Sequence, residues 1–144
     1  MKNIAKLLTV FTAGGLVYGL LEIICRGHTY ISMGFVGGVC MVMIHLLNDE
    51  RRKQLPLFLV LLISDLFIVA SELLSGEILN RALGMQIWSY KSVPFNYDGQ
   101  ICLEYSLAWY LLSLVGVLFD EWIRSHIFKE KPLAVFSMFH KQKA

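Results

Sequence analysis

The residues LPLFLVLLISDLFIVASELL at positions 55–74 decide the fold of this chain. A helix needs roughly 20 predominantly apolar residues to cross the hydrocarbon core of a bilayer, and this stretch supplies them with only two charged side chains, Asp65 and Glu72. Pro56 suits a first helical turn, because its missing N–H would have no partner within the helix. The stretch therefore predicts a transmembrane helix, with an alternative end near residue 83.

Three further segments of similar length and hydropathy flank this stretch, at about residues 4–25, 30–47 and 101–122. The first of them also resembles a secretory signal peptide. We exclude a signal peptide because no small-residue cleavage site follows, and Glu22 and Arg26 lie where one is expected. The pattern predicts an all-α, polytopic membrane protein whose four transmembrane helices form a bundle.

The composition agrees with a membrane location. The chain has 144 residues, of which 56% are hydrophobic and 17% charged, whereas a soluble domain carries about 25% charged residues. These values exclude an ordinary soluble enzyme. The formal net charge of +2 is too small to indicate binding of nucleic acid.

The distribution of basic residues predicts the orientation, because short cytoplasmic loops are enriched in Lys and Arg. Ten of the 13 Lys and Arg residues lie before the first span, between the second and third, or after the fourth. The other three are Arg26, Arg81 and Lys91. We therefore expect a multi-pass protein of the plasma membrane with both termini in the cytoplasm.

The chain divides into a transmembrane domain of residues 1–124 and a cytoplasmic interfacial tail of residues 125–144. Within the tail, Leu133, Val135, Phe136 and Phe139 lie between Lys131 on one side and His140, Lys141 and Lys143 on the other. This pattern predicts a short amphipathic helix on the anionic inner leaflet. A frayed terminus is the alternative.

Two GxxxG motifs, Gly15–Gly19 and Gly34–Gly38, lie in the first and second spans. Each motif places two glycines on one helical face, which allows close approach of two helices in a membrane. The motifs predict tight packing either of these two helices or of two copies of the chain.

Acidic side chains within the spans need a partner or a function, because a charge at the centre of a membrane helix costs about 2.5–3.5 kcal/mol on insertion scales. Asp65 lies near the middle of the third span, and Glu72 follows two helical turns later on nearly the same face. Asp65 has no basic residue within one turn. We therefore expect Asp65 to carry a proton or an ion.

In the expected topology, Glu22, Arg26, Glu72 and Glu77 lie at one depth in the outer leaflet, next to the loop of residues 84–100. One interpretation is a binding site for a cationic or polar ligand; the other is a set of salt bridges that stabilise the bundle. The candidate ligand- or ion-binding residues are Glu22, Arg26, Asp65, Glu72, Glu77, Trp88, Tyr90, Asn96 and Glu104.

No motif indicates catalysis or a cofactor. The chain has no GxxxxGK[ST] phosphate loop and no GxSxG nucleophile motif. We expect no catalytic residue, no metal and no cofactor.

Several stretches together are similar to a known family: residues 18–29, Gly34–Gly38 with residues 43–48, Glu72, and above all the pattern from Trp88 to Leu103. The chain resembles the CmpB-like ABC-transporter permeases, a family of small four-span bacterial membrane proteins. The resemblance covers about residues 18–118 and implies a permease that acts with a separate ATPase or another membrane protein. It supplies no binding residues.

The sequence thus favours a transport-type membrane protein that acts as a homo-oligomer. Its outward-facing acidic and aromatic site would bind a small polar or cationic ligand or an ion. A non-transporting membrane module that binds a partner protein or lipid is the main alternative. A membrane-embedded enzyme acting on lipid head groups, with Glu22, His28 and Glu72 as acid and base groups, is the third.

Overall fold

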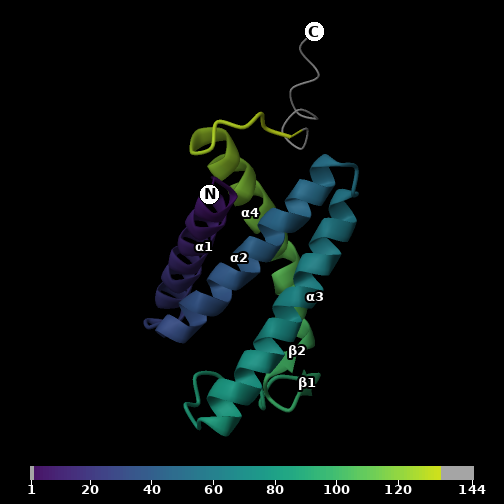
Figure 1. The fold of residues 1–144 in the computed structure, drawn as a ribbon. Helices are drawn as coiled ribbons and strands as arrows, with labels where there is room; N and C mark the ends of the chain where they lie inside the picture. Colours follow the sequence, from purple (N-terminus) through teal and green to yellow (C-terminus); the bar gives the residue numbers. More distant parts are fainter. Residues whose placement is uncertain (1, 134–144) are drawn as a thin grey trace.

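A computed structural model describes residues 2–133 of the chain and contains four long helices. Helix α1 comprises Lys2–Arg26, α2 Ile31–Arg52, α3 Leu57–Gly76 and α4 Leu103–His126 (Figure 1). All four are long and apolar enough to cross a membrane. The predicted four-span, all-α architecture is confirmed, whereas residues 134–144, on which most of the amphipathic tail was predicted, lie outside the described residues.

Helix α3 continues directly into a π-helical segment, η1 (Glu77–Ala82), so that the apolar helix extends to residue 82. A short antiparallel hairpin follows, in which β1 (Asn96–Tyr97) pairs with β2 (Ile101–Cys102). The sequence did not predict this hairpin. It precedes α4 immediately and places the loop of residues 83–102 over the ends of α3 and α4.

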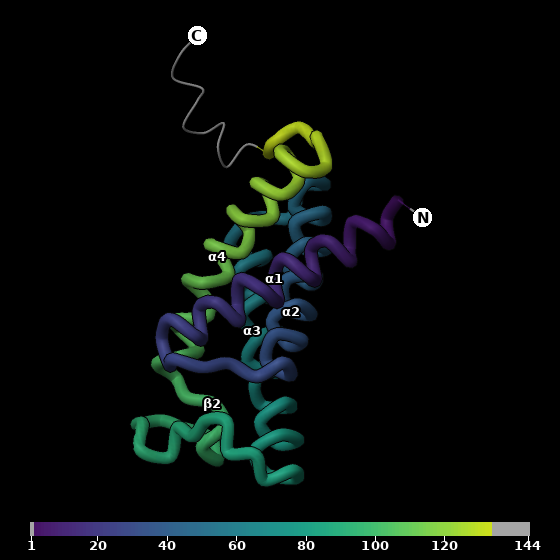
Figure 2. Tube along the Cα trace, turned by 90° about the vertical axis from the view of Figure 1, so that its left-hand side faces the viewer, coloured from purple at the N-terminus to yellow at the C-terminus, as the bar shows by residue number. Residues whose placement is uncertain are grey.

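The helices run alternately up and down between two ends of the molecule. The start of α1, the α2–α3 connection and the end of α4 lie at one end, which we call the terminal end (Figures 1 and 2). Segment η1 and the hairpin lie at the other, the hairpin end, and project beyond the α1–α2 connection. This arrangement brings the loop of residues 83–102 close to Glu72.

Helix α1 packs mainly against α2, and α2 packs in turn against α3 and α4. Glycines bring α1 and α2 together: a Cβ atom on Gly15 would lie 2.7 Å from the Gly34 carbonyl oxygen, and one on Gly37 would lie 2.6 Å from Cβ of Tyr18. The glycine motifs therefore pack two helices of the same chain, one of the two arrangements predicted from the sequence.

Candidate functional site

Glu72 of α3 is a buried carboxylate with 8% relative exposure. The hydroxyl group of Tyr90 donates a hydrogen bond of 2.7 Å to its Oε1 atom. The indole N–H of Trp109 in α4 donates one of 2.9 Å to its Oε2 atom. Both donors are neutral, so they satisfy oxygen lone pairs of the carboxylate without balancing its charge.

The loop holds Tyr90 in place for this contact. Its backbone N–H donates to the Gly99 carbonyl group at 2.8 Å, and its ring stacks on Tyr105 at a centroid distance of 4.9 Å. Burial raises the pKa of the Tyr90 phenol, and the charge of Glu72 raises it further. The phenol therefore keeps its proton and acts as a donor to Glu72.

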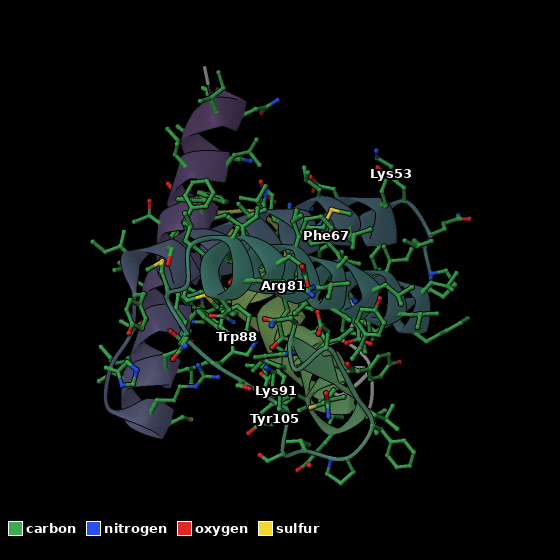
Figure 3. All side chains as sticks on the ribbon, turned by 90° about the horizontal axis from the view of Figure 1, so that it is seen from below. Lys53, Phe67, Arg81, Trp88, Lys91 and Tyr105 are labelled. Carbon is green, nitrogen blue, oxygen red and sulfur yellow. The ribbon has the colours of Figure 1, made fainter. Side chains whose placement is uncertain are left out.

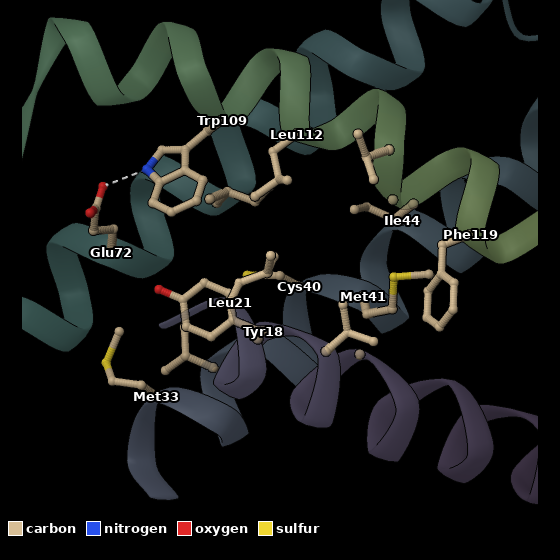
Figure 4. Close-up of a pocket in the computed structure, with 17 residues that line it drawn as sticks. Tyr18, Leu21, Met33, Cys40, Met41, Ile44, Glu72, Trp109, Leu112 and Phe119 are labelled. Atoms are coloured by element: carbon tan, nitrogen blue, oxygen red, sulfur yellow. Dashed lines mark hydrogen bonds between the residues drawn. The ribbon is translucent and has the colours of Figure 1, made fainter. Parts of the chain in front are cut away.

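An apolar cavity of about 200 Å³ begins beside Glu72 and lies between α1 and α4, with α2 as its floor. Figure 4 shows Glu72 and Trp109 at one end of this cavity and Phe119 at the other, with the Tyr18 ring between α1 and Trp109. The residues that line it include Val17, Tyr18, Leu21, Ile44, Glu72, Trp109, Val115 and Phe119. The cavity therefore combines one acidic end with an apolar body.

Glu22 and Arg26 form a second polar group close to the same cavity. Glu22 accepts a hydrogen bond of 2.6 Å from Thr29, and the Arg26 guanidinium group lies 3.6 Å from its carboxylate. The Tyr18 hydroxyl group donates to Glu22 at 3.4 Å, while the Tyr18 ring lies 6.4 Å from the Trp109 ring. Tyr18 and Trp109 thus connect the Glu22 group with Glu72.

The other predicted site residues form no hydrogen bond or ion pair with the Glu72 carboxylate, whose partners among the described residues are Tyr90 and Trp109. At the hairpin end, viewed in Figure 3, Arg81 pairs with Glu77 at 3.1 Å and with Asp98 at 2.5 Å, largely exposed. Trp88 is buried, donates to the Gln100 carbonyl group at 3.0 Å, and belongs to one apolar cluster with Tyr90 and Met33.

Three further candidates, all among the described residues, form neither a hydrogen bond nor an ion pair with Glu72. The Asn96 side chain closes the hairpin turn, where it accepts a hydrogen bond of 3.0 Å from the Gly99 N–H. Glu104 is exposed in the first turn of α4. Asp65 is partly buried, and its Oδ1 atom has no hydrogen-bond partner among the described residues.

Trp109 was not among the site residues predicted from the sequence, although it donates the second hydrogen bond to Glu72. One signal for it was available: a tryptophan within an apolar span needs an acceptor for its indole N–H. Its partner is 37 positions away on another helix, and the sequence alone gives no means of choosing that partner.

A second buried polar cluster, which we call the terminal network, was also missed. It lies at the terminal end and consists of His45, Asn48, Arg51, Asp120, Glu121 and Arg124. Asp120 has no exposed surface; it accepts hydrogen bonds of 2.7 Å from both Asn48 and Arg124, and His45 lies 2.6 Å away. Glu121 binds Arg51 at 3.1 Å.

The terminal network pairs each buried acid with a base, so it is suited to stabilising the bundle. Residues 127–133 fold back onto it: the Leu133 N–H donates to Glu121 at 3.0 Å, and Glu130 pairs with Arg124 and with Lys6. Within residues 2–133, no group of three or more His, Cys, Asp and Glu side chains has the arrangement of a metal site.

Four membrane-length helices around an apolar cavity define a polytopic membrane protein. The family model described as putative ABC-transporter type IV matches residues 7–140. The chain belongs to this family and is a membrane transport-type protein. No curated protein and no solved structure matches the chain.

Proposed function

We propose that this transport-type protein binds a small cation at Glu72. The observation that carries the proposal is the buried carboxylate of Glu72, which has hydrogen bonds from Tyr90 and Trp109 but no ion pair among the described residues. A charge within a membrane span costs about 2.5–3.5 kcal/mol on insertion scales unless it is compensated. A bound cation would supply that compensation.

The aromatic rings beside Glu72 support the same ligand chemistry. Tyr18 and Trp109 line the cavity next to the carboxylate. The face of an aromatic ring attracts a cation with about 0.5–2 kcal/mol, depending on how far the cation is desolvated. A carboxylate flanked by a tryptophan and a tyrosine therefore favours an organic ammonium ion over a polyol or an anion.

Two of the remaining candidates, Arg26 and Asp65, have auxiliary roles in this proposal. Arg26 is paired with Glu22 at 3.6 Å, and this pairing leaves less of its positive charge available to Glu72. Asp65, whose Oδ1 atom has no hydrogen-bond partner among the described residues, lies two turns before Glu72 in α3 and passes a proton or ion deeper into the membrane.

The topology and assembly form part of the proposal. The protein lies in the plasma membrane with its hairpin end facing outward and both termini on the cytoplasmic side. The distribution of Lys and Arg supports this orientation. Because four helices enclose little volume, we place the transport pathway between the subunits of a homo-oligomer. Family membership favours an ATPase as the partner.

Transport of tetramethylammonium, a permanent cation that crosses lipid poorly, tests the proposal. We expect proteoliposomes containing the native chain to take up this ion, and the Glu72→Gln and Asp65→Asn variants to lose at least about 90% of the flux, which corresponds to about 1.4 kcal/mol. Exposed Glu104→Gln is the matched control. Unchanged flux in both variants, with their melting temperatures preserved, would refute this assignment.

A module that binds a partner protein is the second candidate. It is favoured by two aromatic side chains in or next to strand β1 of the hairpin, Phe95 and Tyr97, which are 83% and 65% exposed. Exposed aromatic residues are enriched at protein interfaces. Purification with a stoichiometric partner, combined with no tetramethylammonium flux from the purified chain or from its complex, would favour this candidate.

A further inference from the structure

The shape of the cavity restricts the ligand beyond its charge. On α4 the cavity extends from Trp109 to Phe119, a distance of about 15 Å at 1.5 Å per helical residue. Glu72 is the one charged side chain among its lining residues, and it lies at the Trp109 end. A ligand that fills the cavity therefore has a charged head and an apolar body.

The cavity is open sideways, toward the surface that the lipid covers. Three of its lining residues are substantially exposed: Val17 at 40%, Leu21 at 38% and Val115 at 56%. Val17 and Leu21 belong to α1 and Val115 to α4, and α1 packs against α2 rather than against α4. The gap between α1 and α4 therefore gives access from the membrane.

Building on the proposed cation site, we infer that the ligand is an amphipathic organic cation. Its ammonium group binds Glu72 between the Tyr18 and Trp109 rings, and its apolar tail lies along the cavity toward Phe119 and enters between α1 and α4. A tail buried in this way contributes to affinity through the apolar surface that it removes from water.

A homologous series of probes separates the head from the tail. Binding of tetramethyl-, butyltrimethyl-, hexyltrimethyl- and octyltrimethylammonium is measured with the full chain in phosphatidylcholine nanodiscs, and the signal of empty nanodiscs is subtracted. We expect affinity to rise about fourfold for each added methylene and to level off when the tail outgrows the cavity. Hexanol and octanol, which have the same tails without a charge, are expected to bind at least tenfold more weakly.

Two neighbouring positions on α1 provide a matched pair of variants. Val17 lines the cavity, whereas Leu16 does not line it and is 70% exposed. We expect Val17→Trp to weaken hexyltrimethylammonium binding at least tenfold and to weaken tetramethylammonium binding by a smaller factor. Leu16→Trp, which adds the same ring on the lipid side, is expected to change neither.

The outcomes distinguish this inference from the proposed function. If tetramethylammonium binds in a manner that depends on Glu72 but longer tails add nothing, the amphipathic ligand is refuted and the cation site remains. If alcohols bind as well as the ammonium ions, the cavity holds lipid-like tails and the inference is refuted. If no cation binds the native chain more tightly than it binds a folded Glu72→Gln variant, both proposals are refuted.

Discussion

Asp120 is the most completely enclosed acid of the chain, and its neighbours explain how it is tolerated. Asn48 and Arg124 donate hydrogen bonds to the same Oδ2 atom, and His45 lies against Oδ1. Its carboxylate therefore replaces water by three polar partners. Removal of an acid from such a buried pair leaves the base without compensation, which is more costly than the loss of the pair as a whole.

We expect Asp120→Ala to destabilise the protein by about 3–5 kcal/mol, because Arg124 then remains buried with less of its charge balanced. The measurement is thermal unfolding in detergent, followed by circular dichroism. Lys53→Ala is the control, since Lys53 forms an exposed ion pair with Glu50, and such pairs contribute about 0–1 kcal/mol. Equal melting temperatures for the two variants would contradict a stabilising role for the terminal network.

At the scale of elements, the α1–α2 interface depends on glycine at particular positions. The two glycines of the first GxxxG motif have different surroundings. A Cβ atom on Gly15 would lie 2.7 Å from a backbone oxygen of Gly34, whereas one on Gly19 would find Thr29 at 3.8 Å, an ordinary contact. The motif therefore requires glycine for close packing at its first position only.

The same substitution at these two positions is expected to have opposite effects. Gly15→Ala forces the backbones of α1 and α2 apart and is expected to destabilise the protein by about 1–3 kcal/mol. Gly19→Ala gains helix propensity, up to about 1 kcal/mol, and is expected to be neutral or stabilising. The difference in melting temperature between the two variants measures the effect. A stabilising Gly15→Ala would show that the helices separate without cost.

At the scale of the whole molecule, α1 is connected to the rest of the bundle near both of its ends, apart from its packing on α2. Near the hairpin end, the Tyr18 ring approaches Trp109 of α4. At the terminal end, Lys6 pairs with Glu130, which also binds Arg124 at 3.0 Å. These two contacts tie α1 to parts of the chain other than α2.

The terminal contact is expected to depend on pH. Burial by itself would raise the pKa of Glu130, but hydrogen bonds from Lys6 and Arg124, together with their charges, lower it below its ordinary value of 4.5. Because the folded pKa is lowered, the contribution of Glu130 to stability is fully present above about pH 4.5 and is lost as the pH falls through the folded pKa.

Comparison of the native chain with Glu130→Gln between pH 7 and pH 3 tests this expectation. The native chain is expected to melt at a higher temperature at neutral pH, and the difference is expected to disappear at the acid end. A difference that stays constant over the whole range would mean that the Glu130 charge does not contribute to the contact.

Part of the candidate site follows from the sequence. Glu72 and Tyr90 were both predicted site residues, since a carboxylate within an apolar span is conspicuous in any sequence. Their hydrogen bond and the participation of Trp109 follow from how the loop of residues 83–102 and α4 pack against α3. Contacts of this kind depend on the positions of elements that are distant in the chain.

The sequence by itself determined the four membrane-length helices. Hydropathy and helix length are local properties, and the thickness of the bilayer sets the length of apolar helix that can cross it. Only the tertiary structure decided which charges are buried. Arg51 and Arg124 look like solvated charges at helix ends, yet each also has a partner about 70 residues or more away, at Glu121 and His45 respectively. Burial depends on the packing of all four helices, and no single stretch of sequence specifies that packing.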